Sequence, residues 1–390
     1  MKSRLNTCRI VFIAALFFLQ FTAFIRLTAQ TSFDSLHIKS PKHYFNTIIV
    51  LDSYRKPEKE LKDTSNALSK RLKSYGIRQF NLSLQIPVFT KDIKVDKATT
   101  ENHHVLITGN FMRLRPVFSG IKQHTLTKNG IGVRYIYNTG QKGVWFFDMA
   151  PFVTRDRTYP SKPFFRIAST IIYSRNESYW FNWRIGATKS FLWGNRFYLP
   201  FIGFRIGRLD KFNVSIQFPR QASLNLPLGS KLILSLYTRS QGGLFNFSNH
   251  DSLYFRATDA TFHFTRYEIN TGFRSDIRVN DRFNFYLSSG FSTRNNITFY
   301  SERANSLRPR LPYKTYFFTK NVAPSLFFNF GLVFRLGKTK SYYNNKNIYD
   351  AIDLNNAGNN GNAQIPLTPK KPIKNYNLES VQDLIDYTEF

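Results

Sequence analysis

The sequence predicts an all-β fold, a closed antiparallel up-and-down transmembrane β-barrel of about twelve strands, within a range of ten to fourteen. Three observations predict it. Many runs of about nine to eleven residues alternate between apolar and polar side chains, a length that crosses a bilayer when the strand is tilted. Turn residues such as NTGQKG (138–143) and PLGS (227–230) separate the runs, as in a meander of hairpins. Tyr and Trp gather at run ends, as at membrane interfaces.

The N-terminus predicts a secretory signal peptide over residues 1–30. Lys2, Arg4 and Arg9 form a positive start, and the apolar run that follows is too short for a membrane helix. A retained N-terminal anchor is the alternative. Cleavage removes the only cysteine and four basic residues, which lowers the formal net charge from +31 to +27. The mature chain then has no disulfide, cysteine metal site or cysteine nucleophile, which fits a bacterial envelope protein.

Residues 31–77 predict a short N-terminal periplasmic segment that precedes the barrel. Residues 46–54 could form one short strand. Residues 57–76 contain helix-forming residues and end at Gly76, which is a plausible helix stop.

From residue 78 the period changes to two, which places the barrel at 78–337. In the last run, 326–337, every second residue from Leu326 to Leu336 is apolar, whereas Asn329 and Arg335 lie on the other face. The other runs are 79–89, 104–114, 130–138, 143–154, 164–174, 179–188, 195–207, 211–218, 231–239, 260–273 and 282–288. The run 143–153 is apolar on both faces, so its sides cannot be assigned.

Soluble sheets also alternate, with their apolar face in the core. A secreted soluble β-protein is therefore an alternative to the membrane barrel. The lengths of the runs, the aromatic run ends and the signal peptide favour the barrel, because a closed barrel leaves no sheet edge in hydrocarbon. Residues 338–390 are rich in Asn, Gly and Pro and predict a flexible C-terminal tail.

The chain resembles the outer-membrane β-barrel families of Bacteroidota, specifically one of unknown function. The resemblance covers about 78–337 and rests on Ile86-Pro87, on the block 199–237 and on the closing strand. That strand also looks like a barrel assembly signal, formed here by Asn329, Gly331, Phe334 and Leu336. The resemblance implies a place in the outer membrane, with lipid, lipopolysaccharide and the barrel-assembly machinery as partners, and it brings no catalytic residues.

The alternation places basic residues on the lumen face of the barrel, with few acids beside them. These candidates are Arg134, Arg166, Arg184, Lys231, Arg239, Arg282 and Arg335, with His263 nearby. A basic lumen lowers the barrier for anions. The alternative is that these side chains fill a narrow interior, hydrogen-bonded to polar neighbours and water.

Other function classes have less support in the sequence. The basic residues are spread over turns and strand faces, so nucleic acid is not an expected partner despite the charge. No Gly-x-Ser-x-Gly, His-Glu-x-x-His or phosphate-loop motif occurs. We expect no cofactor, no metal and no enzymatic activity, and a structural or small-solute role with an anion preference; a barrel enzyme acting on envelope lipids is the alternative.

Overall fold

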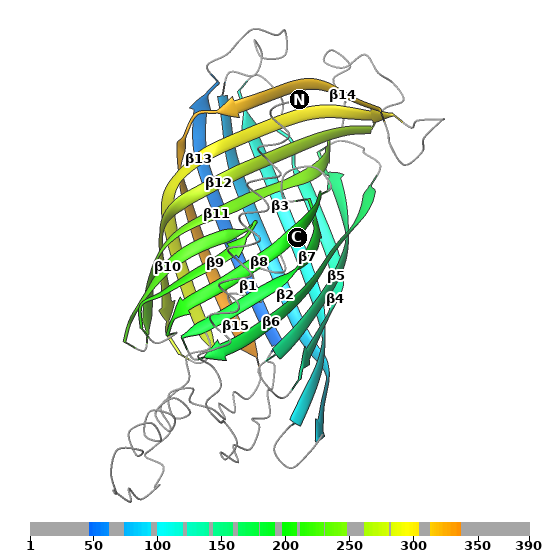
Figure 1. The fold of residues 1–390 in the computed structure, drawn as a ribbon. Helices are drawn as coiled ribbons and strands as arrows, with labels where there is room; N and C mark the ends of the chain where they lie inside the picture. Colours follow the sequence, from blue (N-terminus) through cyan, green and yellow to red (C-terminus); the bar gives the residue numbers. More distant parts are fainter. Residues whose placement is uncertain are drawn as a thin grey trace, which may run out of the picture. The chain divides into compact units, whose positions relative to one another are not determined.

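The computed structural model describes thirteen segments of the chain, and these form a single antiparallel sheet (Figure 1). The segments are 47–61, 74–94, 100–119, 123–139, 143–158, 163–178, 180–191, 197–208, 211–229, 231–247, 261–280, 282–303 and 313–336. The predicted signal peptide and the predicted C-terminal tail lie outside them. Within the segments, no helix is long and apolar enough to span a membrane.

The sheet has fifteen strands in these segments. They are β1 (Thr47–Glu60), β2 (Ser74–Lys94), β3 (Thr100–Phe118), β4 (Leu126–Asn138), β5 (Gly143–Asp156), β6 (Phe164–Ser178), β7 (Phe181–Ser190), β8 (Phe197–Gly207), β9 (Asn213–Phe218), β10 (Gln221–Leu228), β11 (Leu232–Phe247), β12 (Thr261–Arg278), β13 (Phe283–Arg303), β14 (Tyr313–Val322) and β15 (Ser325–Leu336).

Each strand from β1 to β13 pairs with the next, and β15 pairs with both β13 and β1, which closes the barrel. β14 and β15 pair with successive parts of β13, so together they fill one position in the wall. The ring therefore has fourteen positions, an even number at the upper end of the predicted range. The closed, antiparallel, up-and-down fold is confirmed.

Three observed strands are not among the barrel strands that the sequence predicted: β1, β10 and β14. β1 belongs to the wall because it pairs with β2 on one side and with β15 on the other. The prediction that residues 31–77 precede the barrel is therefore wrong for 47–60 and for 74–77, where β2 begins. β10 alternates as the other strands do, with Leu224, Leu226 and Leu228 exposed, but Pro227 made this stretch read as a turn.

The two faces of the wall are chemically distinct. On β15, every second residue from Leu326 to Leu336 is exposed or half-buried, whereas the residues that alternate with them are buried. β2, β4, β6 and β9 likewise turn their alternating apolar set outward, exposed or half-buried, and bury or half-bury their polar set. An apolar outer band of this kind is what a barrel presents to lipid.

Aromatic rings line the outer face near the end of the barrel where β1 begins and β15 ends, here called the termini end. His103 stacks on Tyr137 with ring centroids 4.8 Å apart, and Trp145 lies 4.9 Å from Tyr173, which in turn lies 5.6 Å from Trp183. Rings of this kind form the girdle of membrane barrels. Tyr179, the first residue of the predicted run 179–188, lies outside the described segments.

The connections differ between the two ends of the barrel. At the termini end they are two to five residues long, whereas at the opposite end, here called the loop end, they reach thirteen residues. Outer-membrane barrels have short turns on the periplasmic side and longer loops outside. The connection lengths therefore match a barrel with its termini end toward the periplasm.

The loop-side parts of β11 to β14 leave the wall together. We call this four-stranded part the inserted lobe: residues 240–247, 261–269, 294–303 and 313–322. β11 pairs with β10 only as far as Arg239, and β14 pairs with β13 alone among the described strands. In Figure 1 these strands sweep across the loop end of the barrel toward β5.

Three local features lie near one another where the lobe departs from the wall. β11 has Gly242-Gly243 there, and the β12–β13 ladder has a bulge at Thr293, between the pairs Asn270–Ser292 and Ile269–Arg294. The third is Ala323-Pro324, which lies between β14 and β15. Glycine, a bulge and proline each weaken or bend a strand locally, so the sequence permits a crease at this level.

Candidate functional site

The interior of the barrel is occupied by side chains of the lobe. One lobe face carries Phe245, Phe264, Ile297 and Phe299, and it packs on the inner faces of β1 to β4 in one apolar cluster. The cluster comprises Tyr54, Leu61, Tyr75, Ile77, Met112, Leu114, Phe118, Leu126, Phe245, Phe247, Phe262, Phe264, Ile297, Phe299, Val322 and Phe327. We call it the lobe core. Its rings contact across elements; the Phe118 centroid, for example, lies 5.7 Å from that of Phe299.

The other lobe face lies against β5 and β6. Leu244 and Tyr300 share a buried cluster with Phe152 and Ala168. Thr154 donates to Asn246 at 3.5 Å between β5 and β11. The lobe is thus buried on both faces, with the inner surface of the wall on either side.

A charged group forms the contact between lobe and wall nearer to the crease. Glu268 of β12 is 1% exposed and accepts from Lys56 at 2.9 Å and from the Tyr54 hydroxyl at 2.8 Å, both on β1. Lys56 also donates to Asn295 of β13 at 2.9 Å. A buried carboxylate is tolerated when it is paired and hydrogen-bonded in this way.

Arg266 extends this group toward β2. Its Nη2 donates to the Gln79 side chain, and its Nη1 lies 3.6 Å from the Glu268 carboxylate. Its Nε has no hydrogen-bond partner in the structure, although the residue is 1% exposed. The lobe therefore contacts β1 and β2 through two basic residues and one acidic residue.

Five of the seven predicted lumen residues have their side chains on the inner face. Arg134 is fully buried, with its Nη2 2.9 Å from Asp148 and its guanidinium over the Phe146 ring. Arg166 donates to Thr154 at 3.2 Å, and Arg184 donates to Asn182 at 3.1 Å. Arg239 and Arg335 are 9% exposed.

The other two predicted lumen residues differ. Lys231 and Arg282 are exposed and lie in turns at the termini end, immediately before β11 and β13. His263 is fully buried, but it lies on the lobe face opposite to Glu268, 5.0 Å from Tyr300 between ring centroids. The seven residues therefore do not form one ring.

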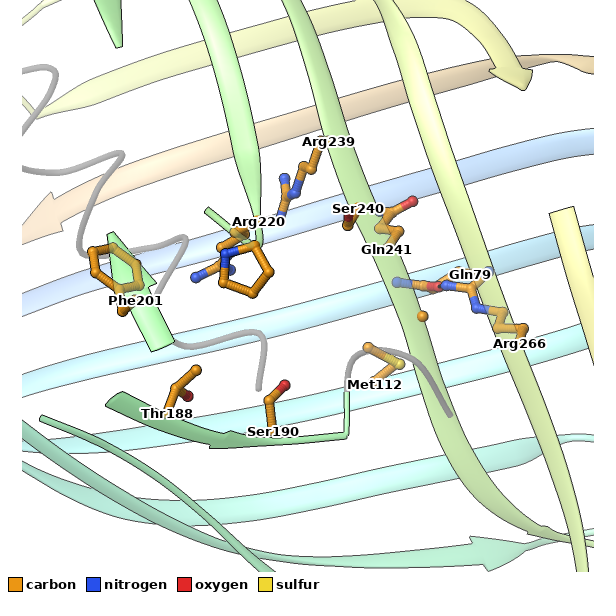
Figure 2. A pocket seen from close by; sticks show the side chains of 12 residues that line it. Gln79, Met112, Thr188, Ser190, Phe201, Arg220, Arg239, Ser240, Gln241 and Arg266 are labelled. Carbon is orange, nitrogen blue, oxygen red and sulfur yellow. Dashed lines mark hydrogen bonds between the residues drawn. The ribbon is translucent and has the colours of Figure 1, made fainter. Parts of the chain in front are cut away.

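One cavity in the interior brings together three arginines from different strands. Arg220 follows the β9–β10 turn, Arg239 lies on β11 and Arg266 on β12; the remaining lining is Gln79, Met112, Thr188, Ser190, Phe201, Pro219, Ser240, Gln241 and Gly242. Figure 2 shows these side chains around the cavity. The three arginines are between 1% and 9% exposed. The cavity volume is about 30 Å³, room for about two water molecules.

The predicted assembly-signal residues all lie on β15, the strand that closes the barrel. Asn329 and Gly331 face inward, whereas Phe334 and Leu336 face outward. Asp52, Gly331 and Tyr286 are aligned on β1, β15 and β13. Tyr286 lies over Gly331, where a Cβ would overlap the ring, and its hydroxyl donates to the Asp52 carboxylate. The glycine thus lets an aromatic side chain link β13 to β1 across the seam.

A buried His–Asp pair, a combination that also occurs in catalytic sites, lies near the loop end of the barrel. His124 Nδ1 lies 2.6 Å from an oxygen of Asp156, with both side chains at most 5% exposed. Asp156 also accepts from the backbone N–H of Thr158 at 3.0 Å, so the pair links the β3–β4 connection to the end of β5. In this described part of the chain, no group of three His, Cys, Asp or Glu residues is placed to hold a metal ion.

Sequence reasoning missed Lys56, Glu268 and Arg266, the residues that join the lobe to the wall. Lys56 was assigned to the periplasmic segment, and Glu268 lies in a run with poor alternation. The signal in the sequence was Glu268 itself. It is the first acidic residue of the strand 261–278, followed only by Asp276, and a buried carboxylate requires a basic partner.

Comparison with known proteins adds a family match. A domain of unknown function, DUF6268, matches residues 161–335, less than half of the chain, a span that includes β6 to β14 and nearly all of β15. No curated protein matches. The match agrees with the expected similarity to a family of unknown function, whereas an origin in Bacteroidota stays a prediction.

Solved structures with some likeness are barrels of other proteins. The β domain of the Bordetella autotransporter BrkA is 8% identical, with 75% of this chain and 100% of that one covered, at a TM-score of 0.27. The transport unit of the autotransporter AIDA-I from Escherichia coli is 6% identical (82% and 97% covered, TM-score 0.26). The siderophore receptor PirA from Pseudomonas aeruginosa is 6% identical (76% and 82%, TM-score 0.24). At these scores the likenesses add nothing to what the strand pairing defines.

Proposed function

We propose that the chain is a non-enzymatic outer-membrane barrel with a structural role, whose interior is closed to the free passage of solutes. The apolar outer band, the aromatic girdle and the short turns at the termini end support a place in the outer membrane. In this proposal, lipid and lipopolysaccharide contact the outer face, and the barrel-assembly machinery recognises β15.

The observation that carries the closed interior is the lobe core. Five phenylalanines of the lobe are in it: Phe245, Phe247, Phe262, Phe264 and Phe299. Burial of each contributes about 1.5–3 kcal/mol, so these five alone favour the docked lobe by roughly 7–15 kcal/mol.

This magnitude decides between the two expectations for the arginines. A steady anion-selective pore requires guanidiniums along a water-filled path. Here Arg134 is paired with Asp148 and stacked on Phe146, and Arg166 is stacked on Phe164. The arginines in these positions support the filled interior, and anion preference is expected only for rare openings.

The test is planar-bilayer conductance of the refolded chain lacking residues 1–30. We expect no steady channels from the wild type. The double variant Phe264→Ser/Phe299→Ser removes two rings from the lobe core and is expected to show channel openings with anion preference. The matched control is Phe273→Ser, because Phe273 lies on the same strand as Phe264 but is 71% exposed on the outer face. Steady wild-type channels would refute the closed interior.

A further inference from the structure

A larger cavity lies on the lobe face that is turned away from the lobe core. It is lined by residues of β12, β13 and β14, and its volume is about 320 Å³. The cavity lined by Arg220, Arg239 and Arg266 has only about 30 Å³. Small-molecule sites usually have about 300–1,000 Å³. This larger cavity, here called the lobe cavity, therefore has room for a small ligand.

The pairing of β12 with β13 places most of the lining on one surface. Asn296 is aligned with Tyr267, and Thr298 is aligned with Thr265. Residues aligned in this way lie on the same face of a sheet, so all four side chains are turned toward the lobe cavity. Tyr316 adds a ring from β14. Three neighbouring strands therefore present phenol, amide and hydroxyl groups to one cavity.

This face is polar in the lobe, although its continuation in the wall has large apolar side chains. Phe273 of β12 and Phe291 of β13, between the crease and the termini end, are 71% and 56% exposed. Beyond the crease, the same face of the two strands carries Thr265, Asn296 and Thr298. A surface in contact with lipid is apolar, so this part of the lobe is suited to water or to a polar ligand.

The lobe cavity is open to solvent on one side. Along β13 its lining changes from the buried Tyr300, which packs on β5 and β6, through the half-buried Thr298 and Asn296 to the exposed Arg294. Tyr316 is 57% exposed, and its ring centroid lies 5.6 Å from that of Tyr300. A ligand that enters beside Tyr316 therefore meets one tyrosine ring at the opening and a second one at the buried end.

The polar groups of the lining offer both kinds of hydrogen-bonding atom. The Oδ1 atom of Asn296 is buried and has no hydrogen-bond partner in the structure. Half a turn of this amide exchanges its acceptor for its donors on the cavity side. The hydroxyls of Thr265 and Thr298 each donate and accept. Because polar groups held away from bulk water are costly to leave without partners, a ligand rich in hydroxyls suits them.

We propose that the lobe cavity binds the ring of a hexose sugar. The hydroxyls around the edge of such a ring each donate and accept, whereas its C–H faces are apolar. Tyrosine side chains are rigid and amphipathic contact surfaces, and Tyr267, Tyr300 and Tyr316 provide three of them. The rings suit the apolar faces of the sugar, and the amide and hydroxyl groups suit its edge. A purely apolar ligand would leave these polar groups without partners.

The test is saturation-transfer NMR with glucose, galactose and mannose as probes. The refolded chain lacking residues 1–30 is held in a polyoxyethylene detergent, because glycoside detergents themselves carry a sugar. We expect saturable binding of at least one hexose, weakened about tenfold by Tyr316→Ser and by Asn296→Leu, which remove a ring contact and a hydrogen bond. The matched control is Tyr198→Ser, since Tyr198 is 73% exposed on the outer face of β8, and it leaves binding unchanged.

Two further variants and one further probe make the result decisive. Tyr316→Phe keeps the ring at the opening and is expected to bind nearly as the wild type does, whereas Thr298→Trp fills the lobe cavity and abolishes binding. Sorbitol carries its hydroxyls on an open chain without a ring and is expected not to bind.

The proposal is overturned if none of the three hexoses binds, if sorbitol binds equally well, or if Tyr316→Ser and Thr298→Trp leave binding unchanged. Because the lobe core lies on the opposite face, the result does not depend on whether the barrel conducts.

Discussion

The ion pair between Lys56 and Glu268 gives the sharpest test of how the lobe is held. Both side chains are at most 1% exposed, and their charged atoms are 2.9 Å apart. Removing one member of a buried pair leaves the other charged and uncompensated, which costs about 3–5 kcal/mol. Replacing both with apolar residues of similar volume is often close to neutral.

We therefore expect unequal losses from the two single variants and a double variant that loses less than their sum. Glu268→Leu leaves both Lys56 and Arg266 without their acid, so it should lower the free energy of unfolding by about 4–5 kcal/mol. Lys56→Met leaves Glu268 with the Tyr54 hydroxyl and with Arg266 at 3.6 Å, and should cost about 3 kcal/mol. The double variant should lose less than Glu268→Leu, because only Arg266 then remains without its acid.

The assay is urea-induced unfolding in phosphatidylcholine vesicles, followed by tryptophan fluorescence, with the double-mutant cycle giving the coupling energy. Losses below about 1 kcal/mol for both single variants, or a double variant whose loss equals their sum, would refute a lobe fixed by this pair. Conductance of Glu268→Leu provides an independent readout, because a loosened lobe should produce brief openings.

Two further predictions concern the seam and the outer face. Gly331→Ala should displace the Tyr286 ring and break its hydrogen bond to Asp52, lowering stability by about 1–3 kcal/mol; in a Tyr286→Ser background the same change should have little effect, and equal losses in both backgrounds would contradict the ring-on-glycine contact. Phe330→Arg places a charge on the outer apolar band and should impair folding into vesicles by about 2–4 kcal/mol, whereas Arg335→Ser on the inner face should fold normally; equal folding of these two variants would show the face assignment to be wrong.

The outer half of the structure could be predicted from sequence because lipid imposes a simple rule. Every outward residue in the band must be apolar, so strands such as β2 and β15 alternate visibly. β1 breaks the pattern at Ser53 and Arg55, because these outward residues are exposed and polar or charged rather than apolar. A strand that leaves the apolar band partway along its length resembles a linker.

The inner half could not be predicted in this way, because the lobe has no polar face. Residues 244–247 (LFNF) and 262–266 (FHFTR) are buried on both faces. Neighbouring residues therefore have similar surroundings, and their side chains do not alternate between apolar and polar. The run 143–153 is ambiguous for a related reason. Phe146 and Phe152 face inward, where the interior is apolar, while Trp145 and Phe147 face outward.

The same reasoning explains why basic residues were found and their roles were not. Alternation fixes the face of Arg134 or Arg239, but whether a guanidinium meets water or an acid depends on residues far away in the chain. Lys56 and Glu268 are 212 residues apart. The crease at Gly242-Gly243, Thr293 and Pro324 brings them together. Each of these is an ordinary strand irregularity in the sequence, and the strand pairing places the three near one another, so that the strands bend at the same level. If the crease causes the closed interior, removing the irregularity from one strand should open the interior less than removing all three. The strands that keep their irregularity would still direct the lobe inward.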